Sequence, residues 1–178
     1  EKYLEDLDDV HYELIRNEKF FAEVEIPRGR QLKRTKVMRP ILECDVLFNL
    51  PMAKSHGGSR VSFSLKNWMG AVKNRGEWHN TFDLHQAIAD FATYIKPTFT
   101  ILDATRVLAT GGPGGPGEIK KLETIIGGFD QVAIDSYTVG LSTWNGRTYQ
   151  PQDIPHIRLA AEMGVGSMDL SGVVVKTV

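Results

Sequence analysis

The chain has 178 residues, 42% of them hydrophobic and 24% charged, and its formal net charge is −1. These values are ordinary for one globular domain and argue against a basic surface for nucleic acid or an anionic membrane. A single cysteine, Cys44, excludes a disulfide framework and an all-cysteine iron–sulfur site within these residues. No window approaches the roughly 20 apolar residues of a spanning helix.

The first forty residues are predicted to be rich in strands. Residues 2–9 are typical of the end of a helix, and three short strands are expected over 11–16, 20–26 and 32–38. We expect this segment to form an antiparallel edge of a sheet or a flap beside it.

Two apolar runs in the middle of the chain predict strands buried on both faces. Residues 45–50 (DVLFNL) stop at Pro51, and residues 98–102 (TFTIL) end at Asp103. Near-continuous apolar runs of this length are typical of parallel strands covered on both sides.

The elements between and after these runs follow from apolar spacing and turn residues. They are a polar loop over 53–60, a helix over 62–72 or a strand over 61–65, a polar loop over 73–79, a helix over 81–95 capped by Asn80 or Thr81, a flap or turn over 111–117 (GGPGGPG), a strand over 122–126, a helix over 130–143 capped by Asp130, a helix over 151–163 and a strand over 172–178.

This order of elements predicts one α/β domain over residues 1–178. Strands and helices alternate in the second half with connections long enough for parallel crossovers. We therefore expect a layered, mixed and largely parallel sheet flanked by helices, with the strand-rich segment at its N-terminal edge. Because the chain begins inside a helix-like segment without methionine, we also expect it to be a fragment of a longer protein.

The loop after the first apolar run is the strongest candidate binding segment. Lys54, His56 and Arg60 fall within seven positions of it, together with two glycines. Ligands of open α/β sheets bind beyond the carboxyl ends of strands, and a cationic loop there suits a carboxylate or phosphate. The alternative is a surface loop with ordinary charges.

Lys66 and Asn67 form a second candidate pair, in the sequence SLKNWMG. Lys66 is either a surface lysine whose stem covers apolar residues or a partly buried functional amine. Burial would lower its pKa and allow it to act as a base or an electrophilic contact. We expect Asn67 to bind substrate.

Asp103 ends the second apolar run and is predicted to meet Lys54 and His56 if the two strands are parallel. Its carboxylate would then pair with a lysine or orient His56 as a general base. In the alternative, Asp103 caps a turn through the amides of Thr105 or Arg106. The predicted catalytic residues are therefore His56, Lys66 and Asp103.

The segment GGFDQVAIDS offers two further binding candidates. Asp130 follows a strand at the start of a helix, which is a common seat for anions, and Asp135 is expected to face inward. We predict that both contribute to the substrate site with Lys54, Arg60 and Asn67.

A divalent metal site would need residues brought together by tertiary contact, because the sequence has no HxH or HxxxH pair. The candidate ligands are His56, His79 and Asp103.

Five ordered segments over residues 45–136 resemble the family called domain of unknown function 362. They are DVLFNLPMAKSHG, SLKNWMG, TILDATR, GGPGGPG and IIGGFDQVAIDS. The resemblance implies a mixed α/β fold and an N-terminal third that is absent from this chain. It also implies that some relatives carry ferredoxin-like four-iron clusters or a twin-arginine export signal. The polar positions implied by the family pattern are Lys54, His56, Lys66, Asn67, His79, Asp103, Asp130 and Asp135.

Three functions remain open at this point. The first is binding of a small anion, carboxylate or phosphate, with or without catalysis. The second is an accessory role beside an iron–sulfur redox module, and the third is a metal-dependent hydrolase or isomerase. The location stays open between the cytoplasm and export by a twin-arginine signal outside this fragment.

Overall fold

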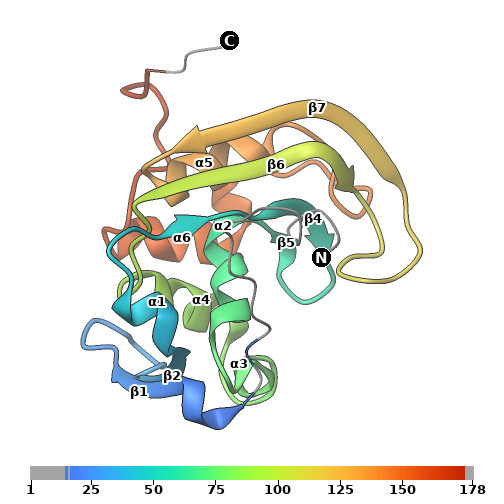
Figure 1. Ribbon diagram of the computed structural model, residues 1–178. Helices are drawn as coiled ribbons and strands as arrows, with labels where there is room; N and C mark the ends of the chain where they lie inside the picture. Colours follow the sequence, from blue (N-terminus) through green and yellow to red (C-terminus); the bar gives the residue numbers. More distant parts are fainter. Residues whose placement is uncertain (1–14, 16, 175–178) are drawn as a thin grey trace, which may run out of the picture.

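The computed structural model describes residue 15 and residues 17–174, which form a five-stranded mixed sheet, a separate two-stranded sheet and helices packed against them (Figure 1). The strands are β1 (Phe21–Glu25), β2 (Arg34–Met38), β3 (Phe48–Asn49), β4 (Met52–His56), β5 (Arg60–Ser62), β6 (Phe99–Leu108) and β7 (Ile119–Gly128). The helices are α1 (Arg39–Glu43), α2 (Ser64–Asn67), α3 (Arg75–Asn80), α4 (Leu84–Ala92), α5 (Gln131–Val139) and α6 (Pro155–Glu162). Short 3-10 turns cover Glu18–Phe20, Trp68–Ala71 and Pro151–Asp153.

Strand β6 is the centre of the larger sheet. It pairs in parallel with β3 and β4 on one side and antiparallel with β7 on the other, and β5 pairs antiparallel with β4. Pro51 separates β3 from β4 because proline has no amide hydrogen to donate to a neighbouring strand. Its carbonyl still accepts a hydrogen bond from the amide of Asp103 at 2.8 Å. The predicted α/β class with a mixed sheet and flanking helices is confirmed.

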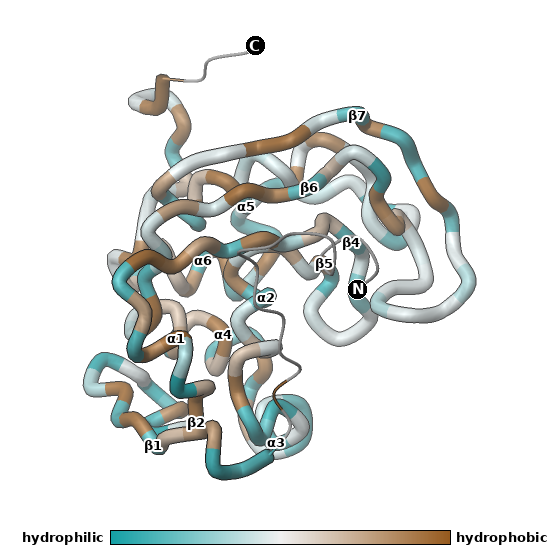
Figure 2. The backbone as a smooth tube through the Cα atoms, viewed as in Figure 1, coloured by the Kyte–Doolittle hydropathy of each residue, from teal (hydrophilic) through white to brown (hydrophobic). Residues whose placement is uncertain are grey.

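The two apolar runs are buried on one face only, so the prediction of strands covered on both sides is wrong. In β6, Leu102 and Ala104 point into the core, whereas Ile101 is 38% exposed. Phe48 in β3 is 53% exposed, and β7 exposes Ile125 beside them. Figure 2 shows the hydrophobic stretches along β6 and β7. The helices α5 and α6 lie on the other side of these strands (Figure 1), so only that side is shielded from water.

The core lies between the sheet and the helices. Helix α4 packs on α6, and α5 contacts both β6 and β7. Two edge-to-face aromatic pairs fill the space, Phe63 with Trp144 at 4.9 Å and Trp78 with Phe91 at 5.4 Å between ring centroids. Such pairs add to the free energy gained by burying their surface.

The expected helix over 81–95 is shorter in the structure, where it is α4 over Leu84–Ala92. The Asp83 side chain accepts a hydrogen bond from the amide of Gln86 at 3.0 Å and starts α4, so neither Asn80 nor Thr81 caps it. Residues 75–79, expected as loop, belong to α3. The prediction that Asp130 caps α5 is confirmed, since its carboxylate accepts from the amides of Val132 and Ala133.

Two connections also differ from the predictions. Residues 53–60 are not a loop, because β4 and β5 form a hairpin across them. The segment 111–117 is a turn, as predicted, but it joins β6 to β7 as antiparallel neighbours, so this connection is not a parallel crossover.

The N-terminal strands form an antiparallel pair, as predicted, but in a sheet of their own. An isolated bridge between Val37 and Val72 ties β2 to the rest of the fold. The Asp90 carboxylate on α4 adds a second tie by accepting from the amides of Gln31 and Leu32. The expected helix over 2–9, most of the strand over 11–16 and the end of the strand over 172–178 lie outside the described residues.

In the described part of the chain, none of the helices is long and apolar enough to cross a bilayer.

Candidate functional site

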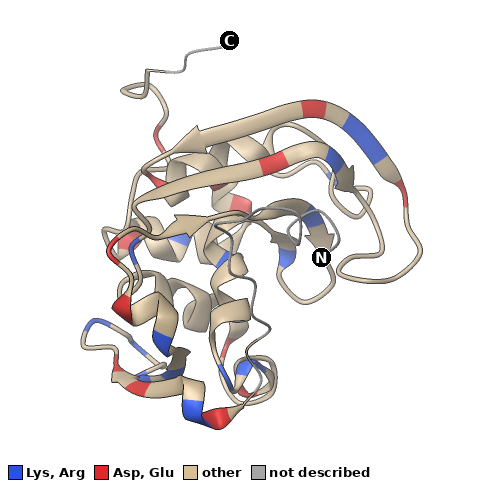
Figure 3. Ribbon diagram, in the orientation of Figure 1, with Lys and Arg blue, Asp and Glu red and all other residues tan. Residues whose placement is uncertain are grey.

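Several basic side chains gather where β4, α2, α3, α4 and α6 meet, and we call them the basic cluster. Its members are Lys54, His56, Lys66, His79, His85 and His156. Figure 3 shows Lys and Arg on β4 and at the start of β5, and the sequences of these two strands contain no acidic residue. The positive charge of the cluster is carried by Lys54 and Lys66, in a chain whose net charge is −1.

Backbone contacts fix the proton position of His56. Its Nδ1 accepts hydrogen bonds from the amides of Gly58 and Ser59, both at 3.1 Å, in the turn between β4 and β5. The neutral ring must then carry its proton on Nε2. Burial, followed by the charge of Lys66, lowers the pKa of His56 to about 4. His56 is thus a neutral hydrogen-bond donor, and its Nδ1 is not free to act as the predicted general base.

Lys66 is a buried amine, with only 8% of the residue exposed. Its Nζ donates to the Met69 sulfur at 3.4 Å, and a thioether is a weak acceptor. Burial is the largest cause that lowers the pKa of Lys66 to about 8, and the charges of Lys54 and Arg75 add to it. Burial also lowers the pKa of the half-buried Lys54.

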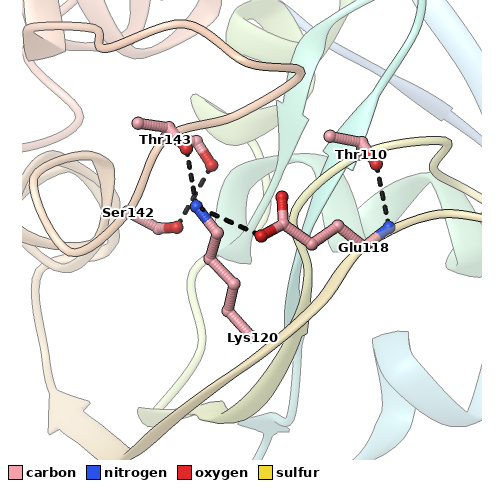
Figure 4. Close-up of polar contacts among 5 residues, drawn as sticks. All are labelled: Thr110, Glu118, Lys120, Ser142 and Thr143. Carbon is pink, nitrogen blue, oxygen red and sulfur yellow. Dashed lines mark hydrogen bonds and ion pairs between the residues drawn. The ribbon is translucent and has the colours of Figure 1, made fainter.

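Lys120 shows how a lysine with suitable partners is placed in the same fold. Its Nζ lies 2.8 Å from the Thr143 hydroxyl and 3.8 Å from a Glu118 carboxylate oxygen (Figure 4). The backbone amide of Glu118 in turn donates to the Thr110 hydroxyl. By contrast, neither Lys54 nor Lys66 has a carboxylate partner within the described residues.

The remaining histidines lie beside these amines in two stacked pairs. His79 stacks on His56 with 5.8 Å between ring centroids, and His85 stacks on His156 at 5.3 Å. The Nδ1 atoms of His85 and His156 are 3.0 Å apart, so one donates and the other accepts. Burial lowers the pKa of His156 well below its usual range, and its Nε2 has no partner among the described residues.

Asp135 fixes the helix that carries Lys66. Its fully buried carboxylate accepts from the amides of Ser64 at 2.9 Å and Leu65 at 3.0 Å, and from the Ser64 hydroxyl. These groups form the first turn of α2, whose free amides need acceptors. Burial raises the pKa of Asp135 to about 7. Asp135 therefore orients α2, and its described side-chain hydrogen bonds all go to residues of that helix.

A network of side-chain amides holds the other end of α2. Asn67 donates to Asn49 at 2.8 Å, and Asn49 donates to Gln131 at 3.0 Å. Gln131 also accepts from the Trp68 indole at 2.6 Å. Neither Asn49 nor Gln131 was predicted from the sequence. The available signal was a polar residue inside an apolar run, which folds stably only when it finds a partner.

Asp103 does not join the basic cluster. Its carboxylate accepts from the amide and the hydroxyl of Thr105, at 2.8 and 2.7 Å, and these bonds lower its pKa. In the sheet, Asp103 lies opposite Met52, whereas Lys54 lies opposite Leu108. The structure thus shows the alternative local bond to Thr105 and no hydrogen bond or ion pair from Asp103 to Lys54, His56 or Lys66 within the described residues.

Two more predicted binding residues are occupied elsewhere. The Arg60 guanidinium donates to the Asp153 carbonyl and lies over the Tyr149 ring at 5.7 Å. Asp130 caps α5 and also accepts from the amide of Ser167 at 2.8 Å. Arg60 holds the segment before α6, and Asp130 joins α5 to residue 167.

The expected metal ligands are not assembled. Among the residues that the structure describes, no group of three or more His, Cys, Asp or Glu side chains is arranged to hold a metal ion. His56 would have to move its proton to Nδ1 to offer Nε2 to a metal, and the two turn amides oppose that change.

Two surface depressions lie away from the basic cluster. One is lined by residues around Gln31, Thr35 and Phe82, and the other by residues around Arg28, Lys96 and Phe129. The cluster itself grades from exposed His79 through half-buried Lys54 to buried Lys66.

A family model described as "Domain of unknown function (DUF362)" matches residues 3–140. The match includes every member of the basic cluster except His156. No curated protein and no solved structure matches the chain.

Proposed function

The chain belongs to the DUF362 family, and we propose that its basic cluster binds a small anion that carries a carboxylate or phosphate group. The observation that carries this proposal is Lys66, a buried amine whose described contact is a thioether sulfur. A buried ammonium group is costly unless a negative group pairs with it. A bound anion would supply the acceptor oxygens that Lys66 lacks.

The neighbours of Lys66 suit the same ligand. Lys54 adds a second half-buried amine, and the fixed tautomer of His56 offers an Nε2 proton. Hydrogen bonds from charged donors to carboxylate or phosphate are short and strong, more so away from water. A ligand entering past exposed His79 would meet these donors in turn.

The other two functions have less support. The iron–sulfur accessory role stays a prediction from the family resemblance. The metal-dependent hydrolase or isomerase would need ligands beyond His56, His79 and Asp103, because these three do not form a metal-binding group in the described structure.

The test is a titration of the protein with inorganic phosphate and with lactate, followed by calorimetry and thermal shift. We expect Lys66→Met and Lys54→Met to weaken binding by about 10- to 100-fold each, since a hydrogen bond to a charged group contributes roughly 1.5–3 kcal/mol. Lys120→Met is the matched control, because Lys120 has partners of its own. Equal affinities in all four proteins, or no binding of either anion, would refute the proposal.

A further inference from the structure

The Lys66 amine has the surroundings of a nucleophile. It is buried against a sulfur atom, and Lys54 and Arg75 add positive charge nearby. With its pKa lowered to about 8, roughly a tenth of the molecules carry an uncharged amine at pH 7. A desolvated lysine beside another cation is a known arrangement for covalent catalysis at carbonyl groups.

We propose that Lys66 forms an iminium with the carbonyl carbon of a small oxo acid. This inference rests on the proposed anion site, which would hold the carboxylate of the same molecule. The carbonyl end would reach buried Lys66, and the carboxylate would stay toward Lys54 nearer the surface.

The step needs no further reactant. The uncharged amine adds to the carbonyl carbon, which forms the carbon–nitrogen bond and turns the carbonyl oxygen into a hydroxyl group. The carbon–oxygen bond then breaks, and the oxygen leaves as water. Counted from the ammonium form of Lys66, two of its three protons leave with the water, and the third stays on the iminium nitrogen.

His56 suits the role of the group that polarises the carbonyl oxygen. Its Nδ1 faces the amides of Gly58 and Ser59, so its Nε2 proton lies on the opposite edge of the ring. A neutral imidazole held in one tautomer can donate to a carbonyl oxygen on which negative charge develops.

The charge of the cluster selects the substrate class. Lys54 and Lys66 lack carboxylate partners within the described residues, so the site favours a carbonyl compound with a negative group over a neutral one. One molecule of a short oxo acid would place its carboxylate beside Lys54 and its carbonyl carbon beside Lys66.

The experiment incubates the whole chain with pyruvate and sodium cyanoborohydride, which reduces an iminium to a stable amine. We expect intact mass and peptide mapping to show one adduct, on Lys66, whose formation is suppressed by excess lactate. The adduct should be absent in Lys66→Arg and retained in Lys120→Arg. Lys66→Met, which removes the amine without adding bulk, serves as a second variant if the arginine protein does not fold, as judged by circular dichroism.

The outcomes separate this inference from the proposed function. Lactate binding without an adduct on Lys66 would overturn the iminium and leave the anion site standing. If neither lactate binding nor an adduct on Lys66 is observed, both the iminium and the anion site are overturned. An adduct that forms equally on exposed lysines, or equally fast from acetone, would overturn the assignment of an oxo-acid site at Lys66.

Discussion

At the scale of single residues, Lys66 and Lys120 differ in their burial and in their hydrogen-bond partners. Lys120 is half-buried with a hydroxyl and a carboxylate within reach, whereas Lys66 is 8% exposed beside a thioether. The fold therefore bears a free-energy cost at Lys66, which is expected where a group is kept for binding or reaction.

Replacing Lys66 by methionine should stabilise the protein at pH 7, by about 1–3 kcal/mol, because it removes a buried charge and keeps the volume. The folded pKa of about 8 lies below the usual value of 10.5, so the unfolded state holds more protons between these values. The wild type then gains stability as pH rises from 8 to 10.5. Urea denaturation should therefore show that the stability advantage of Lys66→Met over the wild type is smaller at pH 10.5 than at pH 7.

The control for this comparison is Lys120→Met, which loses a hydroxyl contact and should gain no stability at pH 7. A Lys66→Met protein that is less stable than the wild type at pH 7 would contradict the prediction.

At the scale of elements, α2 is short and depends on its supports. A four-residue helix is not stable alone, and Asp135 on α5 satisfies the amides at its start. Asn67 at its end is held by Asn49. The position of Lys66 is therefore set by contacts from β3 and α5 and not by local propensity.

We expect Asp135→Ala to lower the free energy of unfolding by roughly 2–4 kcal/mol, because it leaves buried amides of Ser64 and Leu65 without acceptors. It should also weaken phosphate binding, since α2 carries Lys66. Calorimetric titration at a temperature where the variant remains folded gives the second measurement.

Asp130→Ala provides the matched comparison. It removes the N-cap of α5, because the Asp130 carboxylate accepts hydrogen bonds from the amides of Val132 and Ala133. Neither of these bonds involves α2. If Asp130→Ala lost as much phosphate affinity as Asp135→Ala, a general loss of stability would explain the weaker binding, and the position of α2 would not.

Local signals in the sequence predicted the elements better than the site. The cap at Asp130 and the apolar spacing of α4 and α5 are local, and these elements were predicted at nearly the right place. The convergence of Lys66 with His56 and His156 depends on tertiary packing, as does the pairing of Asp135 with α2. The expected meeting of Asp103 with Lys54 failed because strand direction alone does not fix register, and the register places Asp103 opposite Met52.

The whole molecule should lose stability in mild acid because it buries neutral histidines. Burial lowers the pKa of His56 to about 4 and lowers the pKa of His156 well below its usual range, so the unfolded state binds more protons below pH 6.5. The free energy of unfolding should therefore fall as pH drops from 6.5 to 4. Asp135, whose pKa is raised to about 7, acts in the opposite direction over the same range.

Urea denaturation of His56→Asn at pH 6.5, 5.5 and 4.5 checks this expectation. Asparagine can accept from the amides two and three residues ahead, as His56 does, but it does not titrate. The variant should lose less stability in acid than the wild type. His79→Asn is the comparison: burial also lowers the pKa of His79, but His79 is exposed, so its substitution should change the acid dependence less than His56→Asn does. An equal pH dependence in wild type and His56→Asn would contradict the argument.

The pairing of β4 with β6 has a consequence for the growing polypeptide on the ribosome. Met52 and its partner Asp103 are 51 positions apart, so β4 emerges well before the strand that completes it. At ordinary rates of translation this interval lasts about 3–10 s. During that time the backbone groups of β3 and β4 that pair with β6 have no partner strand, and an unpaired strand edge beside exposed apolar side chains is a surface that a chaperone can bind.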